Sequence, residues 1–296
     1  MRRWIALTAT AMVAPALAMA APAAAHAAPG TANATLTAPQ AAPGNPVEAL
    51  RQQFAKKSGV RLDELTRMRL DGEDLLKYRQ VGNLRFGKSG VDALDVKIVL
   101  KGDGKVPDST LRTIVIDGKT YLRSALYDDL LPAGRSWVRA EGGTPTLSTI
   151  DVLQPKVLKT ILASTKSKSP GGKVGGARTT LLRGSVTLAN LAKVSPSLAS
   201  LAKSLKSKKP VALPWKLWIG GDQLPRRFQS SLPISASSLT GKLTIDTDSR
   251  YTSWGKKVVI TAPPATEVVD EEDLQTDLPV TPDLTFPVTG LTARQH

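Results

Sequence analysis

Two four-residue stretches match the S-x-x-K nucleophile pattern of penicillin-recognising serine enzymes. They are Ser200–Lys203 and Ser253–Lys256. The chain has neither the S-D-N nor the K-T-G element that accompanies this pattern, and a chain rich in Ser and Lys produces it by chance. Residues 170–176 are glycine-rich but lack the G-K-[ST] ending of a phosphate loop. The sequence therefore indicates no serine nucleophile and no phosphate-binding loop.

Cysteine is absent, and histidine occurs only as His26 and His296, close to the two ends of the chain. Without cysteine there is no disulfide, thiol nucleophile or thiolate metal site. A Ser-His-Asp triad, a His-based zinc site or a His general base would have to use one of these two terminal histidines. We therefore predict a protein that is not an enzyme and that needs no metal or other cofactor.

Paired acids leave one hydrolytic alternative open, because two carboxylates suffice for glycoside hydrolysis. The candidates are Glu73-Asp74 and Asp128-Asp129. Adjacent residues of a strand point to opposite faces, so solvated surface is the better interpretation of both pairs. The acidic cluster Asp270–Asp273 lacks the D-x-D-x-D-G pattern of a calcium loop and is interpreted as part of a solvated tail.

Positive charge is concentrated in one block. The chain of 296 residues carries 40 Lys and Arg against 25 Asp and Glu, and residues 151–209 hold twelve of the basic residues against Asp151 alone. Such a block can neutralise phosphates, but it has no interleaved aromatic residues on which bases could stack. We predict no nucleic-acid binding and instead a contact with an anionic membrane surface. The residues predicted to contact anionic headgroups are Lys166, Lys168, Lys173, Lys206, Lys208 and Lys209.

The N-terminal segment has the order of a secretory signal. Arg2-Arg3 precede an apolar stretch from Trp4 to about Ala20, and A-x-A sites follow. We expect a signal peptide over 1–27, an Ala/Pro-rich linker over 28–46, one domain over 47–272 and an acidic, disordered tail over 273–296. The predicted location is secreted or extracytoplasmic, in association with the cell envelope.

Apolar residues alternate with polar ones in several segments, which is typical of strands with one buried face. Asp117-Gly118 predicts a two-residue hairpin turn, and helical spacing predicts helices starting near Pro46, Pro155 and Pro196. Residues 164–176 are interpreted as a flexible connector and 258–260 as a strand. Together these patterns favour an α+β fold in which helices cover the apolar face of an antiparallel sheet.

The apolar positions of these strands and helices could line a lipid-sized cavity or fill a solid core, since both need the same inner face. The positions predicted to line a cavity are Leu94, Val96, Ile98, Leu100, Ile114, Ile116, Leu153, Val157, Ile161, Leu217, Ile219, Leu243 and Ile245.

Three stretches carry a family resemblance. They read TYLR followed by LPAGRSWVR within 120–139, LPWKLWIGGDQLPRRF over 213–228 and RYTSWGKKVVI over 250–260. Their order and spacing resemble the actinobacterial LolA-like family of LppX and LprG lipoproteins over about residues 47–272. The resemblance implies a half-barrel, in which a strongly curved antiparallel sheet wraps over helices around an apolar cavity for acyl chains. Members of that family carry a lipid-anchoring cysteine after the signal peptide; because this chain has none, a soluble or electrostatically held form is expected.

The leading hypothesis is an exported, non-enzymatic lipid-binding protein, a carrier or sensor whose ligand is a lipid or glycolipid. The alternative is a cell-envelope interaction or regulatory protein on the same fold with a filled core.

Overall fold

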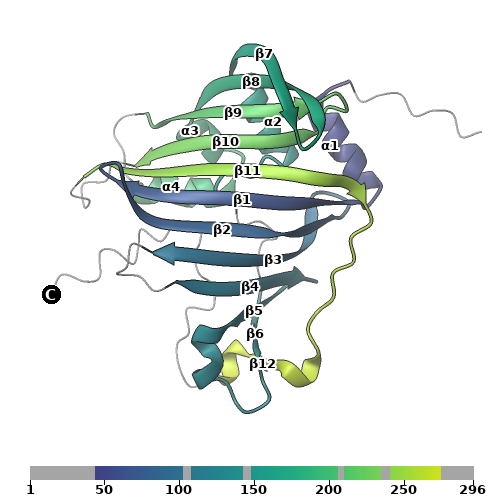
Figure 1. Cartoon of the computed structure of the whole chain (residues 1–296), viewed down its shortest axis with the longest axis vertical. Coiled ribbons are helices and arrows are strands. Elements are labelled where there is room, and N and C mark those ends of the chain that lie inside the picture. Colours follow the sequence, from purple (N-terminus) through teal and green to yellow (C-terminus); the bar gives the residue numbers. More distant parts are fainter. Residues whose placement is uncertain (1–43, 103–107, 143–147, 206–209, 235–240, 275–296) are drawn as a thin grey trace, which may run out of the picture. The chain divides into compact units, whose positions relative to one another are not determined.

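The computed structural model describes residues 44–102, 108–142, 148–205, 210–234 and 241–274. These residues form one twelve-stranded sheet and a layer of short helices (Figure 1). The strands lie in the order β12-β6-β5-β4-β3-β2-β1-β11-β10-β9-β8-β7, so neighbours in sequence are mostly neighbours in the sheet. All pairs are antiparallel except β12 with β6. The α+β class and the antiparallel meander predicted from the sequence are confirmed.

The strands are β1 (Gly59–Leu70), β2 (Glu73–Phe86), β3 (Val91–Gly102), β4 (Ser109–Ile116), β5 (Lys119–Ser124), β6 (Trp137–Glu141), β7 (Thr165–Val174), β8 (Ala177–Thr187), β9 (Ala212–Gly220), β10 (Pro225–Ile234), β11 (Leu243–Lys256) and β12 (Val268–Asp270). The helices are α1 (Pro46–Ala55), α2 (Pro155–Ala163), α3 (Leu188–Ala192) and α4 (Pro196–Leu205), with 3-10 turns η1 (Ala125–Leu130), η2 (Ala265–Glu267) and η3 (Glu271–Asp273).

Two hairpins turn on Asp-Gly pairs. Asp117 and Gly118 have φ values of 52° and 74°, and Asp71 and Gly72 have 50° and 96°. A turn with positive φ at both central residues matches the twist of the flanking strands, and Asp-Gly adopts it at low steric cost. The turn predicted at 117–118 is confirmed, and a turn of the same kind at 71–72 joins β1 and β2.

The helices cover one face of the sheet, which we call the inner face (Figure 1). Each of α1, α2 and α4 begins with a proline, whose missing N–H costs nothing in the first turn. On α2 the buried side chains are Val157, Leu158 and Ile161, one helical face. The larger apolar core lies between this inner face and the helices. The opposite, outer face of the sheet carries most of the charged residues of the strands.

Three expectations need correction. The sheet is not strongly curled and is open, with β7 and β12 as its edges. In β1, β2 and β10 the register shifts lie near strand ends, so few bulges bend the middle of the sheet. Residues 165–174 form β7 and are not a connector, because an edge strand exposed on both faces needs no apolar alternation. Residues 258–260 form no strand, although Ile260 is buried.

No helix within the described residues is long and apolar enough to cross a membrane. The segments predicted as signal peptide and linker lie outside the described residues, apart from 44–46, and so does the predicted tail beyond Leu274.

Candidate functional site

The space between the sheet and the helices is where the sequence places a cavity. Of the thirteen predicted lining residues, ten are buried in the core of the inner face, and Leu100 packs against that core while partly exposed. These ten are Leu94, Val96, Ile98, Leu153, Val157, Ile161, Leu217, Ile219, Leu243 and Ile245.

Ile114 and Ile116 lie on the outer face instead. The register of β3 with β4 places Leu94 opposite Val115 and Ile98 opposite Leu111, and directly opposite residues share a face. Ile114 and Ile116 therefore point the other way, into a smaller outer core with Ala93, Tyr121, Trp137 and Ile260. Their assignment to the inner face is wrong. Residues 113–116 of β4 are all buried, so both faces of the strand are covered at this end. In such a continuous apolar segment the sequence does not show which alternate residues face the helices.

The inner layer is closely packed. A cavity between the inner face and the segment 148–153 has a volume of about 10 Å³, which is space for one water molecule. Among the predicted residues only Leu94, Val96 and Leu153 line it. Pockets that hold drug-sized ligands measure about 300–1,000 Å³. In this state the layer has no room for an acyl chain at that cavity.

A polar cluster lies beside this cavity, within the apolar layer. Glu64 of β1 is fully buried, and its carboxylate accepts hydrogen bonds from Gln80 Nε2 (2.5 Å), Ser148 Oγ (2.6 Å) and Ser249 Oγ (2.5 Å). The donors come from β2, from the segment before α2 and from β11. The cluster thus ties the helical layer to the middle of the sheet.

Burial raises the pKa of Glu64 above its ordinary value, and the nearby Asp151 carboxylate acts in the same direction. The three hydrogen-bond donors favour the ionised form but do not overcome the cost of desolvation. The pKa values of Tyr78 and Tyr251 are also raised by burial, with a further contribution from Glu64. Burial in the cluster therefore disfavours the ionised forms of Glu64, Tyr78 and Tyr251.

Two atoms of this cluster lack a partner. Gln80 Oε1 and the Tyr251 hydroxyl are buried, and both residues line the cavity. Neither atom has a hydrogen-bond partner of ordinary geometry among the described residues, although the Ser249 side chain lies close enough to Tyr251 to act on its pKa. An orphaned buried polar atom costs about 1–3 kcal/mol, so each one calls for an explanation, such as a water or a ligand group. We take the polar groups around Glu64, with the adjoining apolar layer, as the candidate site.

Sequence reasoning missed this cluster, although a signal was present. In β1 the residues Leu62, Glu64, Thr66 and Met68 share the inner face, so an acid occupies a position where the alternation predicts an apolar residue. A carboxylate at such a position is rarely fully buried unless its oxygens are paired.

The predicted headgroup lysines are only partly described. Lys166, Lys168 and Lys173 lie exposed on the edge strand β7, whereas Lys206, Lys208 and Lys209 lie outside the described residues.

The structure brings none of the weak catalytic motifs into a site. Glu73 and Asp74 begin β2, Asp128 and Asp129 lie on η1, and all four are exposed. Among the described residues, no group of three His, Cys, Asp or Glu side chains could hold a metal ion.

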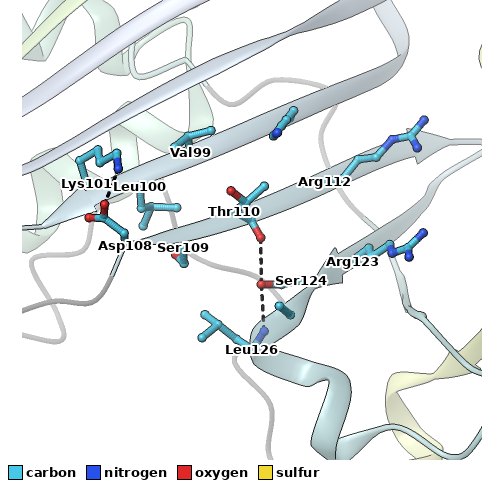
Figure 2. A pocket seen from close by; sticks show the side chains of 12 residues that line it. Val99, Leu100, Lys101, Asp108, Ser109, Thr110, Arg112, Arg123, Ser124 and Leu126 are labelled. Atoms are coloured by element: carbon cyan, nitrogen blue, oxygen red, sulfur yellow. Dashed lines mark hydrogen bonds and ion pairs between the residues drawn. The ribbon is translucent and has the colours of Figure 1, made fainter.

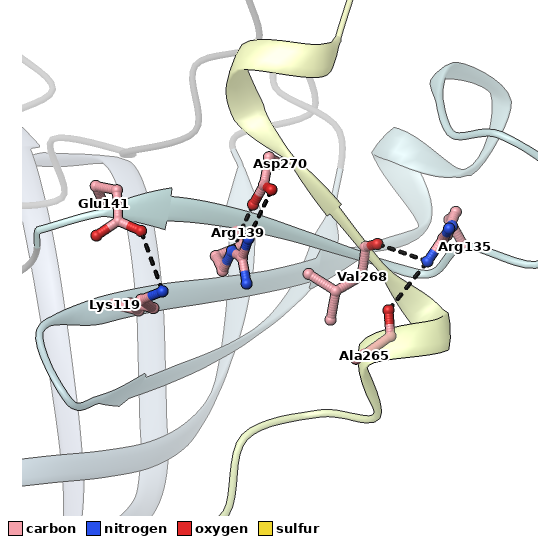
Figure 3. A network of polar contacts seen from close by, with 7 residues as sticks. All are labelled: Lys119, Arg135, Arg139, Glu141, Ala265, Val268 and Asp270. Atoms are coloured by element: carbon pink, nitrogen blue, oxygen red, sulfur yellow. Dashed lines mark hydrogen bonds and ion pairs between the residues drawn. The ribbon is translucent and has the colours of Figure 1, made fainter.

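The acidic cluster at 270–273 is partly structural and not a free tail. Asp270 of β12 forms an ion pair with Arg139, whose Nη2 lies 2.6 Å from the carboxylate (Figure 3). Arg135 donates to the carbonyl oxygens of Ala265 (3.0 Å), Thr266 (2.9 Å) and Val268 (2.8 Å). The C-terminal segment is thereby fastened to β6, where it covers the outer core.

No protein-family model and no curated protein matches the chain. Among solved structures, LprF from Mycobacterium bovis is 15% identical with a TM-score of 0.39, covering 74% of this chain and 96% of its own. The Mycobacterium tuberculosis lipoprotein LppX is 15% identical with a TM-score of 0.38, covering 72% and 98%. A chain of the MucA/MucB complex of Pseudomonas aeruginosa is 10% identical with a TM-score of 0.22; the match covers 74% of this chain and 99% of that one.

Proposed function

We propose that this chain is an exported, non-enzymatic lipid-binding protein, a carrier or sensor that takes an amphipathic lipid or glycolipid between the sheet and the helices. The observation that carries the proposal is the pair of unpartnered polar atoms, on Gln80 and Tyr251, inside an otherwise apolar layer. A hydroxyl group or an N–H-bearing amide group of a lipid could donate to Gln80 Oε1 and accept from the Tyr251 hydroxyl.

The acyl part of the ligand would occupy the apolar layer on either side of this cluster. Burying a methylene group is worth about 0.8 kcal/mol, so a chain of a dozen carbons can supply most of a micromolar affinity. Because the present cavity holds about 10 Å³, binding requires the helical layer to move away from the sheet.

The segment 148–153 is the part whose movement would open the cavity. Ser148 is bonded to Glu64, Leu153 lines the cavity, and Ile150 and Val152 are buried in the same layer. Displacing this segment breaks one hydrogen bond to Glu64 and exposes the wall beside Leu94 and Val96. The expected bound state therefore differs from the present one chiefly at this segment.

The first test is native mass spectrometry with lipid extraction on protein purified from its own host, followed by binding of a fluorescent fatty acid. We expect a co-purifying lipid that the probe displaces. A protein that is purified without lipid and does not bind the probe would refute the proposal.

Tyr251→Phe sharpens the test, since it removes an unpartnered hydroxyl and little else. Stability should stay equal or rise, because an orphaned buried group is lost, while lipid affinity falls about fivefold with the loss of one hydrogen bond. Tyr121→Phe, on the outer face, is the matched control and should leave lipid affinity unchanged. Equal lipid affinity of Tyr251→Phe and the wild type would show that the Tyr251 hydroxyl does not contact the lipid.

A second function is favoured by the close packing of the inner layer. A filled core suits an envelope interaction or regulatory protein that uses its surface and holds no ligand. A lipid-free protein of unchanged stability in the presence of fatty acids would support this function over the first.

A further inference from the structure

A second concave site lies mainly on the outer face of the sheet, and Leu100 is a lining residue that also packs against the inner core. This pocket has a volume of about 600 Å³ and is formed by β3, β4, β5 and η1 (Figure 2). Its lining includes four cations, Lys97, Lys101, Arg112 and Arg123, against the single carboxylate of Asp108. The pocket is thus strongly basic, and none of its residues belongs to the basic block at 151–209.

Three of these cations form a row across the strands. Lys97 is directly opposite Arg112 in the β3–β4 pair, and Arg112 is directly opposite Arg123 in the β4–β5 pair. Like charges in directly opposite positions destabilise a sheet. The row therefore has a cost in the free protein that a bound anion would offset.

The acids near the row neutralise only part of it. Asp95 forms a two-pronged ion pair with Arg112 (2.9 and 2.8 Å), and Asp108 pairs with Lys101. Lys97 and Arg123 form no ion pair with any residue that the structure describes. Two cations of the row are therefore available to an external anion.

The buried ring of Trp137 supports both arginines of the row. The guanidinium carbons of Arg112 and Arg123 lie 5.5 and 6.0 Å from the ring centre. Figure 2 shows both guanidinium groups at the same end of the pocket. Contact with the ring limits the freedom of these side chains, so less entropy is lost when an anion binds them.

Exposed leucines border the basic row. Leu126 lines the pocket with 60% of its surface exposed, and Leu130, on the same turn η1, is 43% exposed. Val99 and Leu100 add apolar surface within the pocket (Figure 2). A small soluble anion would gain nothing from these leucines, whereas a membrane interface accepts cations and apolar side chains together.

We propose that this outer pocket docks the protein on bilayers of anionic phospholipid. Lipid phosphates contact Lys97 and Arg123, and Leu126 and Leu130 enter the interface between headgroups and acyl chains. This docking uses residues distinct from the inner layer and does not rest on the function proposed for it.

The test is flotation of the full-length protein with vesicles of phosphatidylglycerol and phosphatidylcholine, compared with phosphatidylcholine alone. We expect binding to the anionic vesicles only, weakening as salt rises. The double variant Lys97→Gln/Arg123→Gln should weaken partitioning about 25-fold, at roughly fivefold per cation. The control Lys56→Gln/Lys57→Gln makes the same change of charge at two exposed lysines after α1, outside the pocket, and should retain most of the binding.

Leu126→Ser tests the apolar part and should weaken partitioning about three- to tenfold. Val259→Ser, at a residue 74% exposed outside the pocket, is its control. Thermal unfolding of each variant, monitored by circular dichroism, verifies that it folds.

Several outcomes would overturn the docking proposal. One is equal binding to neutral and anionic vesicles. Another is equal loss in the Lys56/Lys57 control and the pocket variant, which would indicate a general effect of charge. Competition by millimolar inorganic phosphate, with no effect of Leu126→Ser, would assign the pocket to a soluble anion. The lipid content of the purified protein is measured separately, so failure here is distinguishable from failure of the inner-layer function.

Discussion

Replacement of Glu64 by glutamine tests the physical description of the buried cluster most directly. The change keeps the shape of the side chain and removes its ionisable proton. The new amide oxygen, in the place of Glu64 Oε2, can accept from both Ser148 and Ser249. Its NH₂ group replaces Oε1 and can donate to Gln80 Oε1 if the Gln80 amide rotates. We expect the variant to fold.

The expected effect is a change in how stability depends on pH. Burial raises the pKa of Glu64 in the folded chain above its ordinary value of 4.5, so between these two values the folded state holds a proton that the unfolded state has lost. The contribution of Glu64 to stability is therefore fully present below about pH 4.5 and is lost as pH rises through the folded-state pKa. One such proton changes the free energy of unfolding by at most about 1.4 kcal/mol per pH unit.

The assay is urea unfolding of the wild type and Glu64→Gln at intervals from pH 2 to pH 9. We expect the free energy of unfolding of the variant to rise relative to that of the wild type as pH increases above 4.5. The difference should become constant once Glu64 is ionised in the folded state. Tyr78 and Tyr251 face the same cluster, but their pKa values are raised above the ordinary value of 10.0, so neither ionises in this pH range.

Asp63→Asn is a control of opposite sign on the neighbouring residue. The hydrogen bond from Arg79 lowers the pKa of Asp63, so its contribution is present at neutral pH and is lost as pH falls through the lowered value. Parallel profiles of Glu64→Gln and the wild type would refute the raised pKa. A variant less stable than the wild type at pH 8 would show that the three hydrogen bonds outweigh desolvation.

Three further predictions concern the stability of the fold: two are measured by chemical denaturation and the third by limited proteolysis. Gly82→Ala should cost about 3 kcal/mol or more, since its Cβ would lie 2.1 Å from the Asp95 carbonyl oxygen; Gly90→Ala, with open space around it, should change stability by less than about 0.5 kcal/mol. Leu158→Ala, at a fully buried position on α2, should cost about 2–5 kcal/mol, and a smaller loss would mean that the inner layer can collapse around the gap. Arg135→Ala removes three hydrogen bonds to the segment 265–268 and should speed limited proteolysis there; an unchanged cleavage rate would show that β12 holds the segment without it.

Local features of the chain were predictable because they depend on a few neighbouring residues. The Asp117-Gly118 turn follows from the backbone freedom of these two residues, and the helix starts at Pro46, Pro155 and Pro196 follow from the missing proline N–H. Ten of the thirteen positions predicted from apolar spacing in strands and helices lie in the inner core. Each of these depends on sequence separations of a few residues.

Contacts between distant residues were not predictable from the same patterns. The carboxylate of Glu64 is paired by Ser148 and Ser249, which are 84 and 185 residues away. The row of Lys97, Arg112 and Arg123 exists only in one register of three strands, and a shift of one residue would send alternate side chains to the other face. Ile114 and Ile116 illustrate the same limit, because only pairing with β3 assigns them to the outer core.

The sequence by itself determined the α+β class, the hairpin turns, the proline-started helices and the absence of cysteine and of an internal histidine. The tertiary structure alone decided that the inner layer is closely packed, that a buried carboxyl lies within it and that a basic pocket with exposed leucines lies on the other face. The physical reason is that backbone preferences and residue chemistry are local, whereas packing, burial and charge proximity depend on which distant strands pair and in which register.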